Sequence, residues 1–151
     1  MCGIAGILDF VHGGRGDLID RFTDALAHRG PDGRGTYTDG PMSLGHRRLS
    51  ILDPSPSGAC PMPVACPDGT TLYITFNGEV YNFLELRREL AGQGYRFRTD
   101  TDTEVVAAAF HRWGEDCQTR FNGMWAFAIW KPATQTLFLS RDRFGVKPLY
   151  V

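Results

Sequence analysis

The amino-acid sequence predicts an α+β fold in which two mainly antiparallel sheets stack face to face, with helices on the outside. Short apolar and β-branched segments alternate with turns rich in Gly and Pro, a pattern typical of antiparallel sheets. Two segments, 82–91 and 103–113, carry helix signals. Met124–Trp130 is apolar at every position, which indicates a strand covered on both faces. With 151 residues, the chain has about the length of one domain.

The first strand and the first helix are expected close to the N-terminus. Residues 3–9 form a short apolar segment that reads as a buried strand. Asp17 is expected to cap a helix that extends to about Ala27. The buried face of this helix is expected to consist of Leu18, Phe22, Ala25 and Leu26.

Dense Gly and Pro then predict a turn at 28–33. Short strands are expected near 35–38, 42–47 and 49–52. The segment 54–67 is rich in Pro and has no periodicity, so we expect a surface loop there.

The β-branched and aromatic run Leu72–Phe76 predicts a strand that stops at Asn77-Gly78. Asn82, with Glu85 three residues later, forms a capping pair that opens a helix to about Ala91, and the glycines that follow end this helix.

The remaining elements follow the same kind of signals. A helix is expected over Thr103–Trp113, stopping at Gly114. After the apolar strand, we expect a turn near Pro132, a strand at 136–140, a turn at 142–145 and a strand that begins at 149–151. A strand cut off at its start would make the chain a fragment of a longer protein.

Composition argues against several classes of function. A formal net charge of −1 leaves no basic excess for a nucleic-acid backbone. No apolar run approaches the ~20 residues of a membrane span, and the N-terminus lacks the basic leader of a secretory signal. We therefore expect a cytoplasmic protein with reduced cysteines. Three of them are expected to be small buried hydrophobic residues, because their spacing does not match a zinc site: Cys60, Cys66 and Cys117.

Cys2 differs from the other cysteines by its position. Removal of Met1 would place a thiol and a free α-amino group on one residue. Such an amine, with an ordinary pKa of about 7.7–8.0, can serve as the base for its own side chain. The alternative is that Cys2 is an incidental residue at the start of a strand.

Asn77 and Gly78 are candidates for stabilising an oxyanion. Attack on a carboxamide builds negative charge on the carbonyl oxygen, and a side-chain amide next to a backbone N–H can donate to it. Asn-Gly is also the commonest dipeptide of two-residue hairpin turns, so a hairpin is the alternative.

A free amino-acid substrate needs one partner for its carboxylate and one for its ammonium group. An Arg binds a carboxylate with two hydrogen bonds, and Arg47 and Arg48 alternate across a strand, so only one of them can face a given pocket. Glu79 and Asp102 are available for the ammonium group. The alternative is an ordinary strand whose arginines are solvated charges.

The acidic segment Thr99–Glu104 precedes the helix predicted at 103–113. We interpret it as a helix cap, because its spacing does not match a calcium loop, with Asp102 also able to reach the pocket. The histidines are scattered and predict no metal site.

Taken together, five separated motifs occur in one order: Met1–Gly6, His28–Asp32, His46–Asp53, Asn77–Asn82 and Arg141–Tyr150. In this combination the whole chain resembles the N-terminal glutaminase domain of glutamine-hydrolysing asparagine synthetases, a class II (type 2) glutamine amidotransferase with the N-terminal-nucleophile hydrolase fold. The resemblance implies a four-layer α/β/β/α sandwich whose C-terminal part is missing here.

The resemblance also implies roles for individual residues. Cys2 matches the nucleophile, Asn77 and Gly78 match the oxyanion hole, and Glu79 and Asp102 match the groups that hold the substrate's amino end. It selects Arg48 over Arg47 as the ligand of the substrate carboxylate, and it assigns backbone contacts with glutamine to the strand Leu49, Ser50, Ile51 and Leu52.

The implied activity is hydrolysis of glutamine to glutamate and ammonia for ATP-dependent synthesis of asparagine from aspartate. No cofactor is implied for residues 1–151, whereas ATP and Mg²⁺ are expected for a synthetase (ATP-pyrophosphatase) domain that this chain does not contain. A homodimer is left open. One departure from the family pattern is Cys60, where the family usually has Gln.

Two alternatives remain at this point. The domain could belong to another amide-forming, aminosugar-forming or phosphoribosylamine-forming enzyme, for which sequence beyond Val151 would decide. It could also be a non-catalytic module that packs on a synthetase domain, although intact Cys2, Asn77 and Gly78 argue against that.

Overall fold

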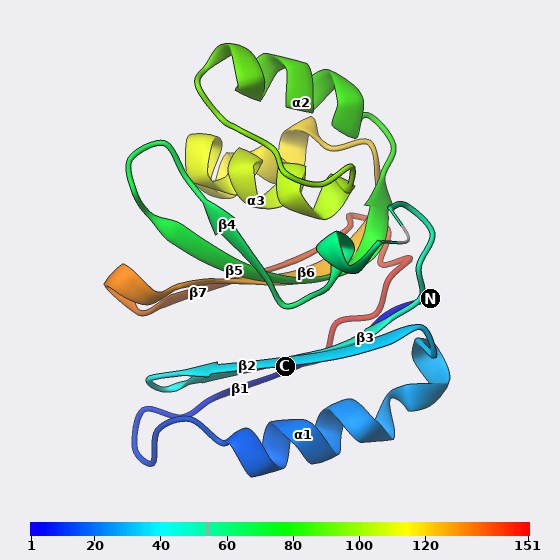
Figure 1. Cartoon of the computed structure of the whole chain (residues 1–151), viewed down its shortest axis with the longest axis vertical. Helices are drawn as coiled ribbons and strands as arrows, with labels where there is room; N and C mark the ends of the chain where they lie inside the picture. Colours follow the sequence, from blue (N-terminus) through cyan, green and yellow to red (C-terminus); the bar gives the residue numbers. More distant parts are fainter. Residues whose placement is uncertain (54) are drawn as a thin grey trace.

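The computed structural model describes residues 1–53 and 55–151 and shows four layers (Figure 1). One outer layer is helix α1 (Gly16–Ala25). The first sheet has the order β1-β3-β2, and the second has the order β4-β5-β6-β7, with antiparallel pairing throughout. Helices α2 (Phe83–Gly92) and α3 (Asp102–Trp113) cover the far face of the second sheet. The predicted α/β/β/α sandwich is thus confirmed. Its strands are β1 (Gly3–Leu8), β2 (Gly33–Asp39), β3 (Met42–Arg48), β4 (Met62–Ala65), β5 (Thr71–Val80), β6 (Gly123–Lys131) and β7 (Thr136–Arg141).

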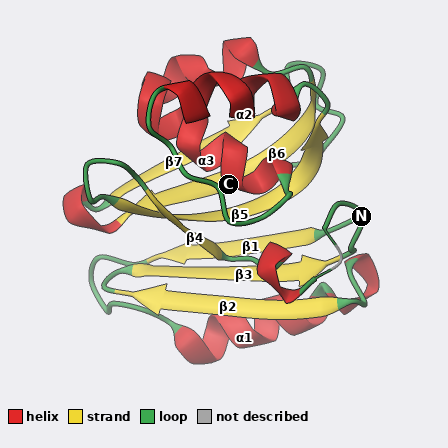
Figure 2. Cartoon of the chain, turned by 45° about the horizontal axis from the view of Figure 1, so that its top comes forward, coloured by secondary structure: helices red, strands yellow, loops and turns green. Residues whose placement is uncertain are grey.

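The two sheets stack with β3 facing β5 (Figure 2). Two hydrogen bonds join them directly: His46 Nε2 donates to the Phe76 carbonyl oxygen at 3.0 Å, and Thr75 Oγ1 donates to the Gly45 carbonyl oxygen at 3.2 Å. Away from these bonds, a small apolar cluster fills the interface. The larger core lies between the second sheet and the helices α2 and α3. The inter-sheet cluster contains Met42, Leu44, Ala128 and Trp130.

Helix α1 buries a different face from the one predicted. Ile19 and Thr23 are fully buried, whereas Phe22 is 47% exposed. The reason is Gly45 in β3, which has no side chain and lets the helix approach the sheet at Ile19 and Thr23. Asp17 does not cap the helix either, since it lies in the first turn.

The predicted stop of the fifth strand at Asn77 is wrong, and so is the hairpin alternative. Strand β5 continues to Val80, and Asn77 pairs with Ala126 in the β5–β6 ladder. Gly78 permits this pairing, because a Cβ atom there would lie 2.7 Å from the Cα atom of Trp125.

The strand predicted at 49–52 does not form. The β2–β3 ladder ends at Arg48, and the next amides bond to side chains instead: Leu49 N to Cys2 Sγ and Ser50 N to Asp32 Oδ2. Residues 149–151 also form no strand. They lie beside β1 without backbone hydrogen bonds to it among the described residues.

The predicted Pro-rich loop contains an element of its own. Strand β4 lies within it, with Met62 and Val64 buried in the core. Pro63 is tolerated because β4 is an edge strand of the second sheet. Residue 54, the first of the predicted loop, lies outside the described residues.

Both C-terminal helices were predicted within about one residue. Helix α3 ends at Trp113, and its C-cap is Gly114, whose positive φ of 61° suits glycine. Asn82 does not cap α2 through its side chain, which bonds instead to the backbone of Arg120 and Asn122.

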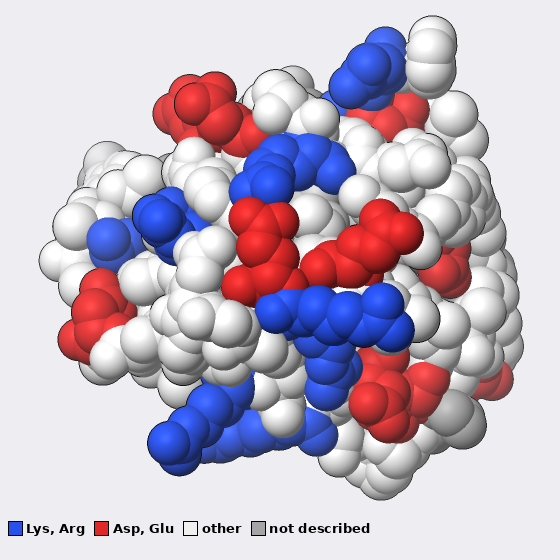
Figure 3. All heavy atoms as spheres, turned by 90° about the horizontal axis from the view of Figure 1, so that it is seen from above, with Lys and Arg blue, Asp and Glu red and all other residues white. Residues whose placement is uncertain are grey.

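The outer face of the second helical layer carries charges of both signs, interleaved without a patch of one sign (Figure 3). Arg120 pairs there with Glu89 at 2.8 Å. In the described part of the chain, every helix is too short or too polar to cross a membrane.

The contact of α1 with β3 should be sensitive to a single methyl group. We expect Gly45→Ala to lower the free energy of unfolding by about 1–3 kcal/mol, because the added Cβ overlaps the buried Thr23 hydroxyl. Gly92→Ala is the control: no atom lies within 4 Å of its added Cβ, so it should stabilise α2 by about 0.5 kcal/mol. Urea unfolding measures both, and equal midpoints for the two variants would contradict the close approach.

Candidate functional site

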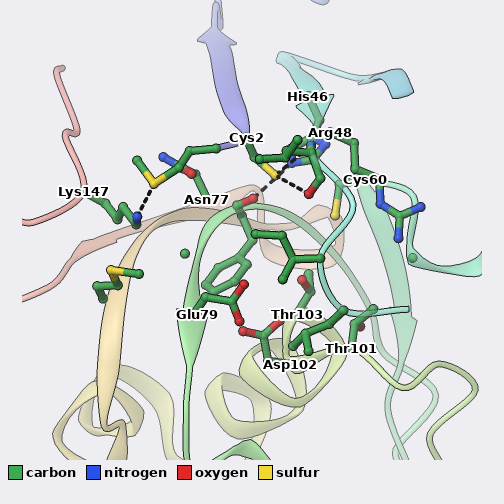
Figure 4. A pocket seen from close by; sticks show the side chains of 18 residues that line it. Cys2, His46, Arg48, Cys60, Asn77, Glu79, Thr101, Asp102, Thr103 and Lys147 are labelled. Carbon is green, nitrogen blue, oxygen red and sulfur yellow. Dashed lines mark hydrogen bonds between the residues drawn. The ribbon is translucent and has the colours of Figure 1, made fainter. Parts of the chain in front are cut away.

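A pocket opens at the end of the sandwich where β1 begins and β3 ends, between the two sheets (Figure 4). Its walls come from the N-terminus, the end of β3 and the loop after it, the second half of β5 and the start of α3. The residues predicted from sequence converge here from distant parts of the chain. Those that line the pocket are Cys2, Arg48, Leu49, Ile51, Leu52, Asn77, Gly78, Glu79 and Asp102.

Cys2 lies immediately before β1 and is half-buried. Its Sγ atom accepts a hydrogen bond from Leu49 N at 3.4 Å and donates one to the Leu49 carbonyl oxygen at 3.7 Å. The sulfur therefore bonds to the Leu49 backbone groups, which have no strand partner because β3 has ended at Arg48. Met1 also lines the pocket, and its sulfur contacts Lys147 Nζ.

Ser50 is the predicted site residue that does not line this pocket. Its amide donates to Asp32 Oδ2 at 2.8 Å, and Asp32 N donates in turn to the Arg48 carbonyl oxygen at 3.0 Å. These bonds turn Ser50 away, into a neighbouring hollow. Asp32 thus shapes the loop beside Cys2.

Asn77 and Gly78 lie in the interior of β5. Side chains alternate along a strand, so Asn77 is on the same face as Thr75, which bonds to the first sheet. Asn77 is only 4% exposed, and its carboxamide makes no hydrogen bond within the described residues. Its donors are therefore available to a bound molecule.

The two neighbouring arginines point to different sides of β3. Arg47 donates to the Thr23 carbonyl oxygen at 3.0 Å and to Asp24 at 2.6 Å, so it is tied to α1. Arg48 lines the pocket, donates to the Ser55 carbonyl oxygen at 2.7 Å and contacts that of Asp53. These bonds hold its guanidinium group at the loop that closes one end of the pocket.

Two carboxylates lie in the opposite wall. Asp102 is 4% exposed, and its Oδ2 accepts a hydrogen bond from Val80 N at 2.8 Å. Burial raises the pKa of Asp102 to about 6, and the negative charge of Glu79 also raises it, although the hydrogen bond from Val80 N lowers it. Burial also raises the pKa of Glu79, while the charge of Lys147 lowers it.

The acidic segment before α3 is a helix cap, as predicted. Thr101 Oγ1 accepts from Glu104 N at 3.4 Å, and the Glu104 carboxylate accepts from Thr99 N at 2.9 Å. Thr101 is thus the N-cap residue, and Glu104 ties the first turn of α3 to the preceding loop, which orients this turn and with it Asp102. Among the described residues, no group of three or more His, Cys, Asp and Glu side chains is arranged to hold a metal ion.

The sequence patterns assigned no site role to the two buried basic residues that line the pocket, His46 and Lys147. His46 is 2% exposed, and burial lowers its pKa to about 4, so it is neutral at pH 7 and donates to Phe76 between the sheets. Lys147 is 3% exposed. Lys147 could have been found from the sequence because it directly follows the predicted turn at 142–145. In the structure Asp142 of this turn accepts a hydrogen bond from Lys147 N.

The three other cysteines are buried, as predicted for small hydrophobic residues. Burial raises the pKa of Cys60 to about 12, of Cys66 to about 11 and of Cys117 to about 12, so they remain thiols at neutral pH. Cys60 lines the pocket beside Cys2.

Because the pKa of Asp102 is raised, we expect Asp102→Asn to have a higher free energy of unfolding than the wild type, by an amount that grows with pH. Between an unfolded pKa of 3.8 and a folded pKa of about 6, the folded state holds the extra proton, so the wild-type free energy of unfolding falls as pH rises. Asn keeps an oxygen for Val80 N and has no charge to bury. The variant should match the wild type at pH 4 and exceed it by about 2–3 kcal/mol above pH 6.

Denaturant unfolding from pH 4 to 8 measures this difference. Asp100→Asn, measured over the same pH range, is the control, because the Asp100 side chain is 93% exposed and its substitution removes no buried carboxylate. A flat difference for Asp102→Asn would show that Asp102 titrates normally.

Comparison with known proteins connects this geometry to a family. The family model described as glutamine amidotransferase domain matches residues 1–151. Glutamine-hydrolyzing asparagine synthetase 1 of Bacillus subtilis is 40% identical over 99% of this chain and 24% of that protein. Glutamine-hydrolyzing asparagine synthetase 1 of Arabidopsis thaliana is 33% identical over 100% of this chain and 25% of that protein. The chain therefore spans about a quarter of the length of these curated relatives.

A solved structure shares the fold. Glutamine phosphoribosylpyrophosphate amidotransferase from Bacillus subtilis matches 98% of this chain and 38% of its own with a TM-score of 0.78 and 21% identity. This likeness bears on the fold alone, and it agrees with the predicted N-terminal-nucleophile hydrolase architecture. Because the family model matches it from end to end, the chain belongs to the glutamine amidotransferase domain family.

Proposed function

We propose that this domain hydrolyses glutamine to glutamate and ammonia through a thioester on Cys2. The observation that carries the proposal is the pocket itself, in which the half-buried Cys2 thiol shares the lining with an asparagine amide, an arginine and two carboxylates. Membership in the glutamine amidotransferase domain family supports the same substrate.

The first step is attack of the Cys2 sulfur on the side-chain carboxamide carbon of glutamine. The electron pair of the C=O bond moves to oxygen, and the Asn77 amide with the Gly78 backbone N–H donates to that oxyanion. As the oxyanion collapses, the C–N bond breaks and ammonia leaves with a proton from the general acid. Water then adds to the glutamyl thioester, and the C–S bond breaks to give glutamate and the free thiol.

The proton carrier in this proposal is the α-amino group of Cys2. It takes the thiol proton before attack and returns it to the leaving nitrogen, so a histidine is not needed. His46, buried, neutral and bonded to Phe76, stays a structural residue. The mechanism requires removal of Met1, because an amide nitrogen cannot act as the base.

Substrate recognition is proposed to use both ends of the pocket. Arg48 binds the α-carboxylate, Glu79 and Asp102 bind the α-ammonium, and backbone groups of 49–52 line the glutamine chain. The Ser50 amide already donates to Asp32, so in this proposal Ser50 takes part only through its carbonyl oxygen.

The ammonia is proposed to serve ATP-dependent synthesis of asparagine from aspartate, by analogy with the names of the curated relatives. In this proposal residues 1–151 form a truncated type 2 glutamine amidotransferase domain, and ATP and Mg²⁺ act in a synthetase domain elsewhere in the parent protein. We propose a cytoplasmic location and leave open a homodimer, with no role for nucleic acid or membrane.

Cys2→Ala should abolish glutamine hydrolysis while leaving the fold intact, because the other thiol of the pocket, Cys60, is buried and stays protonated at neutral pH. We expect a loss of at least about 10³-fold in kcat, measured as glutamate released by protein from which Met1 has been removed. Cys66→Ala, also a buried cysteine but outside the pocket, is the control and should retain wild-type turnover. Undiminished turnover in Cys2→Ala would refute the proposed function.

Arg48→Lys should weaken glutamine binding, because a lysine cannot form the paired hydrogen bonds of a guanidinium group. We expect KM for glutamine to rise about tenfold or more with a smaller change in kcat. The neighbouring substitution Arg47→Lys removes the same fork on the α1 side of β3 and should leave KM unchanged. Equal effects of the two substitutions would exclude a carboxylate-binding role for Arg48.

A further inference from the structure

Lys147 is a buried cation at the wall of the pocket. It is 3% exposed, and its Nζ contacts the sulfur of Met1, which is a weak, uncharged acceptor. None of the ion pairs among the described residues includes Lys147. Burial of an ammonium group without an ion pair is costly, so the position of Lys147 calls for a reason beyond packing.

The turn before Lys147 is built to hold it there. Asp142 accepts hydrogen bonds from Val146 N and Lys147 N, each at 2.9 Å. Arg141 Nε donates to the Lys147 carbonyl oxygen at 3.0 Å. The turn contributes little to the core, because Phe144 is 86% exposed and Val146 is 55% exposed. Its ordered backbone therefore serves mainly to direct one side chain, that of Lys147, into the pocket.

The opposite wall holds two carboxylates that repel each other. Glu79 follows Gly78 in β5, and Asp102 opens α3 within the same pocket. Asp102 is buried and Glu79 is half-buried, so each disfavours ionisation of the other, and without a nearby positive charge one of the two carboxyl groups tends to keep its proton. A protonated carboxyl group binds an ammonium group poorly.

We propose that Lys147 is a positioning residue of the site, whose buried ammonium is the counter-charge that keeps Glu79 ionised for an amino-acid ammonium group. Lys147 acts across the pocket and does not itself bind the substrate. The positive charge of Lys147 then compensates the negative charge of Glu79. The α-ammonium group of a bound amino acid compensates the negative charge of Asp102, so the four charges sum to zero. The inference rests on the proposed function, because it assumes an amino acid as the ligand.

The other groups that face Glu79 do not supply this charge. His46 is buried and neutral. Arg48 lies at the far end, bonded to the carbonyl oxygens of Ser55 and Asp53. The α-amino group of Cys2 does not supply it either, because it is uncharged when it acts as the base and, once protonated, balances the Cys2 thiolate. The remaining titratable side chains of the pocket can contribute only negative charge: Cys2, Cys60 and Asp102.

Removal of Met1 is expected to strengthen the effect. The Met1 side chain occupies the space next to the Lys147 ammonium, and its loss opens that space to the pocket. Fewer protein atoms then separate Lys147 from the site of the substrate.

The test compares Lys147→Met, which removes the charge, with Lys147→Arg, which keeps it, in protein shown by mass spectrometry to lack Met1. In Lys147→Met the acid limb of kcat/KM for glutamine should move to higher pH by about 0.5–1 unit, since Glu79 then takes up a proton more readily. KM should rise about three- to tenfold near pH 6 and approach the wild-type value above pH 8, with kcat little changed. Lys147→Arg should restore the wild-type profile.

Lys131→Met, at the only other lysine of the chain, is the matched control and should leave the profile unchanged. An unshifted acid limb in folded Lys147→Met would overturn the proposal, as would a loss of kcat that is the same at every pH.

A second measurement does not depend on activity. The side-chain carboxyl ¹³C signal of Glu79 is titrated in the wild type, in Lys147→Met and in Lys147→Gln. A higher midpoint in both variants supports the inference, and an unchanged midpoint overturns it. If the wild type hydrolysed no glutamine but the midpoint still shifted, the proposed function would fail while the electrostatic coupling stood.

Discussion

The hydrogen-bonded contact between β3 and β5 is the constraint on which the site depends. His46 and Thr75 reach across from opposite sheets to the backbone of the other sheet, and Gly45 lets α1 close on β3 from behind. This contact fixes the distance between the layers. It therefore sets the N-terminus, which pairs with β3, against Asn77 of β5. A sandwich with wider spacing would contain the same residues without a pocket between them.

Most polar groups of the pocket are engaged by the protein itself, and the few that remain free define its chemistry. Arg48 is held by loop carbonyls, Asp102 by Val80 N, and the Cys2 sulfur by Leu49. The Asn77 amide has no such partner among the described residues. Burial disfavours the charged form of His46 and of the acids alike, so the electrostatic state of the site depends on how the buried charges compensate one another.

Sequence patterns predicted the helices and strands where the local signal and the tertiary environment agree. The wrong predictions share one physical cause: a contact with a segment that is remote in the sequence overrides the local pattern. Asn77-Gly78 has the composition of a hairpin turn, but pairing with β6 is possible because Gly78 admits the neighbouring backbone. The buried face of α1 is set by the missing side chain at Gly45 on another element. Strand β4 lies in a Pro-rich segment because it is an edge strand.

By itself, the sequence determined the layered α+β architecture and half of the residues that line the pocket, because periodicity, caps and motifs are local properties. It also held the nucleophile candidate, since a cysteine after the initiator methionine is visible without a fold. The choice of Arg48 over Arg47 came from the motifs shared with a family, and spacing alone left it open. Only the tertiary structure decided that Arg47 is tied to α1, that Ser50 turns away, and that Lys147 enters the pocket. These outcomes depend on where a strand ladder ends and which backbone a turn supports, and such distances between remote segments are set only when the layers pack.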